Sequence, residues 1–139
     1  MYGERTDEIA ARLQECAKDA QVLVVQGGIN DIAQGRPVEP AAENLRRMVE
    51  RGKEAGLRVA IAELLPWNNG YSHADPKIRR LNELIHALAR DEDVPVLPFY
   101  ETLEDPARPG RMKEEWTSDG DHPSVDGYRL LGEQAFRLP

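Results

Sequence analysis

The feature that most constrains the fold is an alternation of amphipathic helical segments with short apolar segments. Apolar residues recur at the three- and four-residue spacing of one helix face over residues 7–19, 40–55, 76–90 and 125–135. Between these segments lie largely apolar runs at residues 22–25, 57–65 and 94–98. Alternation of this kind predicts right-handed crossovers and a parallel sheet covered by helices on both faces. The expected fold class is therefore α/β.

Individual segments also carry signals for their ends and their burial. Val22–Val25 has no polar position, which is typical of a strand buried on both faces. Two prolines, Pro95 and Pro98, favour an edge position for the strand at residues 94–98. Thr6 and Ser124 are expected to cap the first and last helices. The last helix is expected to direct four side chains inward, those of Val125, Tyr128, Leu131 and Ala135.

The bulk composition narrows the class of protein. The chain has 139 residues, a net charge of -7 and one cysteine, Cys16. This length predicts a single domain over residues 1–139. The acidic balance, with no cluster of Lys and Arg, argues against a nucleic-acid partner, and a single cysteine excludes an internal disulfide.

The same sequence gives no membrane signal. No apolar run approaches the length of a membrane span, and residues 1–5 lack the apolar stretch of a signal peptide. We therefore expect no membrane partner and a cytoplasmic location for the chain as given. If the chain is a fragment, an upstream signal peptide stays compatible with this sequence.

Two polar stretches lie where functional sites form in a parallel sheet, in the loops between a strand and the next helix. One follows the predicted strand at residues 22–25, and the other precedes the last helix. The first is Gly27-Gly28-Ile29-Asn30-Asp31. Its glycines could serve only a tight turn, with Asn30 or Asp31 as a helix cap. In the functional alternative, Gly28 lets the backbone approach a ligand while the Asn30 amide points at a developing oxyanion.

The second stretch, Asp119-Gly120-Asp121-His122-Pro123, ends at the last helix. An Asp three residues before a His can fold back so that its carboxylate accepts a hydrogen bond from one imidazole nitrogen. The other nitrogen would then be free to act as a base. The alternative is a turn-stabilising Asp119 beside an exposed His122.

Together the two stretches resemble signature blocks of the SGNH (GDSL) hydrolase family. Supporting similarities lie at residues 44–48, 64–67 and 124–128. The resemblance implies a three-layer α/β/α sandwich with a flavodoxin-like parallel sheet, and hydrolysis of acyl esters by a Ser-His-Asp arrangement of the esterase and lipase type. It implies no metal and no cofactor. The implied substrate is a small acyl ester.

The resemblance also implies roles for particular residues. His122 resembles the general base and Asp119 the residue that orients it. Asn30 resembles a side-chain donor in the oxyanion hole, and Gly28 a residue that keeps the turn open for substrate. Gly3 matches a glycine whose backbone N–H is a further oxyanion donor.

The family's first block, a strand followed by Gly-Asp-Ser, is expected upstream of Gly3, where this chain has only two residues. The serines are Ser72, Ser118 and Ser124, and none follows a Gly-Asp pair. Three explanations stay open: a fragment or misplaced start, a natural truncation that lost the chemistry, or a substitute nucleophile such as Ser72 or Ser118. The corresponding alternative function is an inactive scaffold that binds a ligand or itself.

Three further expectations complete the sequence-based prediction. Loss of the first central strand would leave an unpaired edge at Val22–Val25, through which the chain could form a homo-oligomer. Trp67, Tyr71 and Trp116 flank the expected cleft as pocket residues. His73 and Asp75 could suggest a metal site, but no third ligand has a suitable spacing. His86 lies outside the apolar face of its helix and is expected to be exposed.

Overall fold

A parallel three-stranded sheet forms the centre of the fold. The structure, a computed structural model, describes residues 3–137. The strands are β1 (Val22–Val25), β2 (Arg58–Ala62) and β3 (Val96–Leu97), in the spatial order β1-β2-β3. The register pairs Val22 with Arg58 in one ladder and Ile61 with Val96 in the other. The predicted parallel sheet is confirmed, and β3 lies at its edge as expected.

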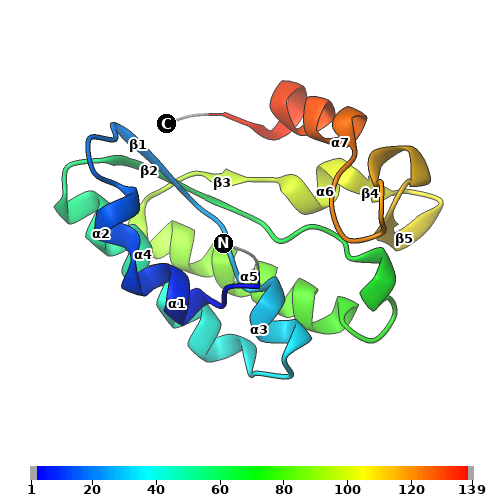
Figure 1. The fold of residues 1–139 in the computed structure, drawn as a ribbon, viewed down its shortest axis with the longest axis horizontal. Helices are drawn as coiled ribbons and strands as arrows, with labels where there is room; N and C mark the ends of the chain where they lie inside the picture. The colour runs from blue at the N-terminus through cyan, green and yellow to red at the C-terminus, as the bar shows by residue number, and fades with distance from the viewer. Residues whose placement is uncertain (1–2, 138–139) are drawn as a thin grey trace.

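Helices cover both faces of this sheet (Figure 1). On one face lie α1 (Thr6–Ala11), α2 (Leu13–Cys16), α3 (Ile29–Ala33), α4 (Val38–Glu54) and α5 (Asp75–Glu92). On the other face lie α6 (Phe99–Leu103) and α7 (Val125–Leu130), which continues as a π-helical turn over Leu131–Ala135. Short 3-10 turns, η1 (Asn68–Gly70) and η2 (Glu114–Trp116), and an antiparallel pair, β4 (Glu104–Asp105) and β5 (Arg108–Met112), complete the chain.

The alternation of side chains along β2 divides the core into two parts. Val59 and Ile61 pack with Leu45 of α4 and Leu81 of α5. The intervening Ala60 and Ala62 point to the opposite face, as successive residues of a strand do. There they pack with side chains from α6, β5 and the C-terminal turn, namely Leu103, Met112, Leu131 and Ala135. The architecture is therefore the expected α/β/α arrangement.

The first and last helices differ from the sequence prediction. The helix expected over residues 7–19 is divided at Arg12 into α1 and α2. Thr6 is not its cap, because its backbone N–H and hydroxyl bond to Asp31 instead. In the last helix, Val125 and Tyr128 are 75% and 59% exposed. The inward stripe consists of Gly127, Leu131 and Ala135, which recur every four residues, so Val125 and Tyr128 lie on its flanks.

Strand β1 lies at the open edge of the sheet. Val25 is buried, whereas the other three residues of the strand are half-buried, so the predicted burial on both faces is wrong for them. Within residues 3–137, no strand pairs with the second edge of β1. Its outward backbone groups are therefore placed to accept a further strand.

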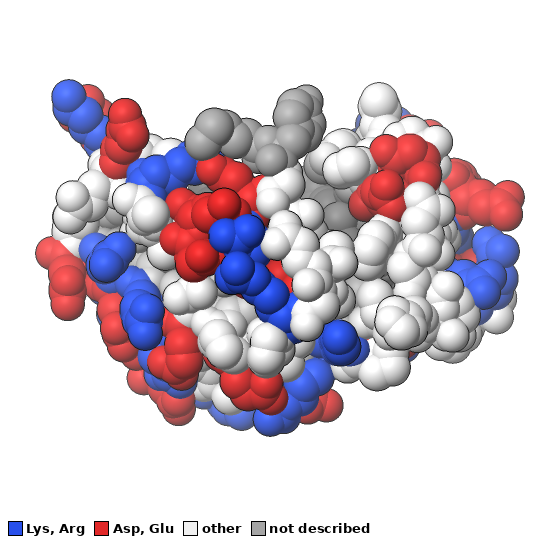
Figure 2. Space-filling model, turned by 60° about the horizontal axis from the view of Figure 1, so that its bottom comes forward, with Lys and Arg blue, Asp and Glu red and all other residues white. Residues whose placement is uncertain are grey.

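On the face shown in Figure 2, Lys and Arg side chains lie beside Asp and Glu side chains, next to a broad area of uncharged residues. The two signs of charge are therefore mixed on this face. None of the described helices is long and apolar enough to cross a membrane.

Candidate active site

A cleft of about 520 Å³ opens at the carboxyl ends of β1 and β2. Gly28 and Asn30 line it from the β1 side, Trp67 from the β2 side, and His122 from the loop before α7. Residues that lie about ninety positions apart in the sequence thus share one cavity. Its remaining walls are mostly apolar, with Ile9, Ile29, Ala33, Leu64, Leu65, Pro66, Pro123 and Tyr128.

The loop before α7 brings Asp119 and His122 together. Nδ1 of His122 lies 2.8 Å from Oδ2 of Asp119, so the expected fold-back contact is present. The other carboxylate oxygen accepts hydrogen bonds from the backbone N–H groups of His122 (2.7 Å) and Asp121 (2.8 Å). The hydrogen bond from the His122 side chain, followed by these two backbone donors, lowers the pKa of Asp119 to about 2.

This geometry determines which nitrogen of the imidazole is free. A carboxylate at neutral pH only accepts hydrogen bonds, so the proton of the neutral ring lies on Nδ1. Nε2 then carries the lone pair that a general base needs. The side chains of His122 and Asp119 are 67% and 50% exposed, so the pair is reachable from the solvent as well as from the cleft.

The loop is also fixed at both of its ends. The Thr117 hydroxyl donates to the carbonyl of His122 (2.8 Å) and accepts from the backbone N–H of Gly120 (2.9 Å). Ser124 caps α7 as predicted, because its hydroxyl accepts from the N–H of Gly127 (3.1 Å). The same hydroxyl donates to the carbonyl of Glu115, so it is used in the structure of the loop.

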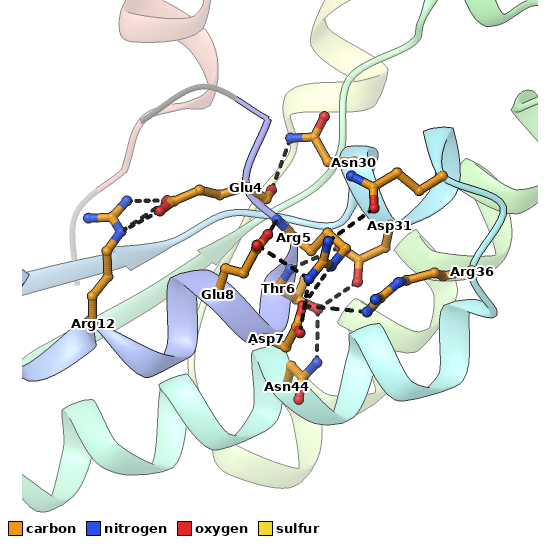
Figure 3. Close-up of polar contacts among 11 residues, drawn as sticks. Glu4, Arg5, Thr6, Asp7, Glu8, Arg12, Asn30, Asp31, Arg36 and Asn44 are labelled. Atoms are coloured by element: carbon orange, nitrogen blue, oxygen red, sulfur yellow. Dashed lines mark hydrogen bonds and ion pairs between the residues drawn. The ribbon is translucent and has the colours of Figure 1, made fainter.

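Asn30 lies at the start of α3 and its amide is partly engaged. Nδ2 donates to the backbone carbonyl of Glu4 at 2.9 Å (Figure 3). Because a side-chain amide has two N–H donors, one of them is left for a ligand in the cleft. Sequence reasoning gave no indication of the Glu4 contact, which joins segments 26 residues apart.

An ion pair holds Glu4 in this position. Nη2 of Arg12 lies 2.6 Å from the Glu4 carboxylate, and Nε makes further contacts with both of its oxygens (Figure 3). The hydrogen bonds from Arg12 lower the pKa of Glu4. Both residues line the cleft. The pair therefore forms a charged wall beside Asn30.

Asp31 is the buried anchor of the same region. Its carboxylate accepts from the backbone N–H and the hydroxyl of Thr6, each at 2.9 Å. Asn44 of α4 donates to the same hydroxyl at 3.0 Å. Figure 3 shows these contacts converging on the start of α1. They fix residues 3–6 against α3, so Glu4 and Asn30 keep their mutual position.

The two predicted glycines differ in their surroundings. Gly28 is the N-cap of α3 with φ +121°, and a Cβ on it would lie 2.5 Å from Leu81 of α5. The close packing of α3 on α5 thus requires glycine whether or not a ligand binds. Gly3 has φ +77° and lies beside Glu4, and it is not itself a lining residue of the cleft.

Several residues predicted from the sequence lie outside the cleft. Tyr71 stacks under Arg111, with the guanidinium 4.2 Å from the ring centroid, and Trp116 packs against the second core and Lys113. Of the three predicted pocket aromatics, only Trp67 lines the cleft. The exposed Ser72 and Ser118 do not line it either. The cleft-lining residues among those described include no serine.

The other histidines are not brought to this cleft. His86 is exposed, as its place off the apolar face of its helix predicts, and its Nε2 lies 3.0 Å from the buried Glu63. Within residues 3–137, no group of three His, Cys, Asp or Glu side chains is placed to hold a metal ion. The Asp75 carboxylate instead accepts hydrogen bonds from Arg79 (2.8 Å) and the Tyr100 hydroxyl (2.6 Å).

Comparisons with known proteins agree with this architecture. A GDSL-like lipase from Bacteroides thetaiotaomicron superposes with a TM-score of 0.85 at 24% identity, over 96% of this chain and 71% of that one. A member of the lipolytic G-D-S-L family from Veillonella parvula has a TM-score of 0.81 at 24% identity, over 96% and 73%. An acetyl xylan esterase has a TM-score of 0.79 at 15% identity, over 96% and 75%.

At these identities the likeness establishes the fold. No curated protein sequence matches the chain. The family model of GDSL-like lipases and acylhydrolases matches residues 1–130, which include both polar stretches that form the cleft. The chain therefore belongs to the GDSL-like lipase/acylhydrolase family.

Proposed function

We propose that the chain forms the acyl-binding and proton-transfer part of a carboxylic ester hydrolase, with small acyl esters as substrates. One observation carries the proposal: the cleft joins a carboxylate-bound imidazole, His122, to an amide donor, Asn30. Ester hydrolysis needs both a base and a donor to the developing oxyanion. Family membership supports the same reaction class.

In the proposed mechanism, Nε2 of His122 removes the proton of the attacking hydroxyl as its oxygen adds to the ester carbonyl, and returns the proton to the leaving alcohol as the ester C–O bond breaks. Water, activated by the same nitrogen, then attacks the acyl intermediate, which releases the carboxylic acid and restores the hydroxyl. Asp119 holds the ring in the Nδ1–H tautomer and stabilises the imidazolium that forms. The second N–H of Asn30 donates to the oxyanion. We assign the backbone N–H of Gly3, which is not a lining residue but whose neighbour Glu4 lines the cleft, as a further donor. Gly28 lets the acyl group approach the start of α3. No step uses a metal or a cofactor.

The walls of the cleft support this substrate class. Ile29, Ala33, Leu64 and Pro66 offer an apolar surface for an acyl group, and the ring of Trp67 extends it. A volume of about 520 Å³ lies within the range of small-ligand sites. One structural neighbour is an acetyl xylan esterase, which supports short acyl groups.

The first experiment measures hydrolysis of p-nitrophenyl acetate by the purified chain and by two histidine variants. His122→Ala is expected to lower kcat/KM by roughly 10²–10⁴, because it removes the general base. His86→Ala is the matched control, since it removes a histidine that also contacts a carboxylate but lies outside the cleft. Equal activity of all three proteins would contradict the mechanism.

A fluorophosphonate probe addresses the nucleophile in the same samples. Ser-His-Asp chemistry requires a serine against His122. Mass spectrometry of the labelled protein identifies that serine, or shows that Ser72, Ser118 and Ser124 all stay unlabelled. In the second case, with hydrolysis still dependent on His122, the base would activate water directly.

The alternative is a non-catalytic scaffold that binds a ligand or a second copy of itself. The absence of a serine from the described cleft residues, together with the open edge of β1, favours this alternative. Self-association would pair Val22–Val25 of two copies. Analytical ultracentrifugation then detects a dimer. The parallel register with β2 directs the N–H of Leu23 toward β2 and that of Val24 toward the open edge. Val24→Pro, which removes this outward N–H, is therefore expected to dissociate the dimer without creating hydrolytic activity.

A further inference from the structure

The 3-10 turn η1 lies directly against the loop that carries Asp119 and His122. Nδ2 of Asn69 donates to the backbone carbonyl of Asp119 at 2.8 Å and to the carboxylate of Asp121 at 2.7 Å. The backbone N–H of Asn69 donates to the carbonyl of Gly120 at 3.3 Å. One residue thus binds three consecutive positions of the loop.

Trp67 contacts the same loop from the cleft. Its indole Nε1 donates to Oδ1 of Asp121 at 2.6 Å, the oxygen that also accepts from Asn69. Its ring is part of the cleft wall. Trp67 therefore touches both the space where a substrate would lie and the loop that holds the imidazole.

The fit between the turn and the loop leaves no room for a larger residue. Gly120 has φ +83°, and a Cβ on it would lie 2.5 Å from Oδ1 of Asn69. The loop backbone is therefore pressed against the Asn69 side chain. This close approach and the three hydrogen bonds select one position of the loop.

The loop has little other support on that side. The side chains of Asp119 and His122 are half or more exposed, so they are not held by burial in a core. Thr117 fixes the carbonyl of His122 and the N–H of Gly120 from within the loop. Contacts from a different part of the chain come from Asn69 and Trp67.

We propose that Asn69 and Trp67 are positioning residues, which hold the Asp119–His122 pair at the cleft through Asp121 and the backbone of residues 119 and 120. The kinetic consequence rests on the proposed hydrolase function, whereas the positioning itself is a property of the loop. Trp67 also makes the position of the loop sensitive to what occupies the cleft.

The test compares Asn69→Ala and Trp67→Phe with the matched control Asn68→Ala. Trp67→Phe keeps an aromatic ring in the cleft wall and removes the indole N–H donor together with the second ring. Asn68 lies in the same turn, but its amide bonds to the backbone of Met112 in β5 and not to the loop. All four proteins are measured well below their unfolding temperatures.

The first readout is the NMR signal of the Nδ1 proton of His122, which does not require activity. In the native protein and in Asn68→Ala this proton is protected by Asp119 and gives a resolved downfield signal. In Asn69→Ala the signal is expected to broaden or disappear through exchange with water. An unchanged signal in Asn69→Ala, or an equal loss in Asn68→Ala, would overturn the proposal.

The second readout is ester hydrolysis. Asn69→Ala is expected to lower kcat by about 10-fold with little change in KM, because a misplaced base slows the chemical step more than binding. Trp67→Phe is expected to lower kcat less, since Asn69 still holds Asp121. If the native chain does not hydrolyse esters but the Nδ1 signal depends on Asn69, the hydrolase function fails and the positioning role stands.

Discussion

Removal of the Thr6 hydroxyl tests how the start of α1 is fixed to the cleft. Thr6→Val keeps the shape of a side chain that is 0% exposed but loses two hydrogen bonds, to Asp31 and from Asn44. The Asp31 carboxylate is 3% exposed and keeps only its bond to the Thr6 N–H. A hydrogen bond to a charged group contributes about 1.5–3 kcal/mol and a neutral one about 1 kcal/mol.

The sum predicts that Thr6→Val lowers the free energy of unfolding by about 3 kcal/mol, since the lost bonds are one of each kind. For a chain of this length such a loss corresponds to a fall in Tm of roughly 10 °C. Urea unfolding followed by circular dichroism at neutral pH measures the change.

Two variants serve as controls for this measurement. Thr102→Val removes a single hydroxyl bond, to the carbonyl of Pro98, and is expected to destabilise by only about 1 kcal/mol. Thr6→Ser keeps the hydroxyl and loses one methyl group, about 1 kcal/mol. A Thr6→Val variant no less stable than Thr102→Val would refute the reasoning that Asp31 depends on Thr6.

Three further predictions concern the cleft and the core. Gly28→Ala is expected to destabilise the fold by about 2–4 kcal/mol, because the new methyl group meets Leu81 at 2.5 Å and the backbone stays at positive φ. Thermal unfolding measures the loss of stability, and an unchanged Tm would contradict the prediction. Leu45→Ala, at a fully buried position in α4, is expected to cost about 2–5 kcal/mol in urea unfolding, and a loss below 1 kcal/mol would show that the site is not packed as described. The pKa of Asp119 is lowered to about 2 in the folded protein, against about 3.9 in the unfolded chain. The ionised carboxylate therefore contributes fully to folding stability above about pH 4, and this contribution is lost as the pH falls toward 2. The stability difference between the native protein and Asp119→Asn should shrink over that range, and a constant difference would contradict the lowered pKa.

The main elements could be predicted because their patterns are long or purely apolar. α5 repeats Ile78, Leu81, Ile85 and Leu88 on one buried face, and its pattern needs no tertiary context. β1 consists of four consecutive apolar residues, and its first and last residues are those predicted from the sequence. By contrast, α6, β4 and β5 have two to five residues each, which is too short for a period to be visible.

Other features depend on partners that are distant in sequence. Thr6 has the residue type of a helix cap, yet it bonds to Asp31, 25 positions away, because α1 and α3 both pack on α4 and enclose the two side chains. Whether Val125 and Tyr128 face the core depends on how the last helix is rotated about its axis. Gly127 packs on the backbone of Trp116, and this contact rotates the helix so that Val125 and Tyr128 point to solvent.

In the candidate site, too, local contacts could be predicted from the sequence and long-range contacts could not. The local Asp119–His122 contact follows from a spacing of three residues and could be predicted. The contact of Asn30 with Glu4 and the contacts of Asn69 with the loop join residues 26 and 50 or more positions apart. In the sequence, Asn69 is one polar residue of a turn-rich segment, with no signal to distinguish it from Asn68.

The central claim is that Asn30 and His122 act on the same reacting ester, and a double-mutant cycle tests it most directly. The measured quantity is kcat/KM for p-nitrophenyl acetate in the native protein, Asn30→Ala, His122→Ala and the double variant. We predict that each single substitution lowers kcat/KM by roughly 10²-fold or more, and that the double variant is little worse than His122→Ala, because groups that act as a unit are not additive. Full activity in Asn30→Ala or His122→Ala, or losses that simply multiply in the double variant, would contradict a shared catalytic site.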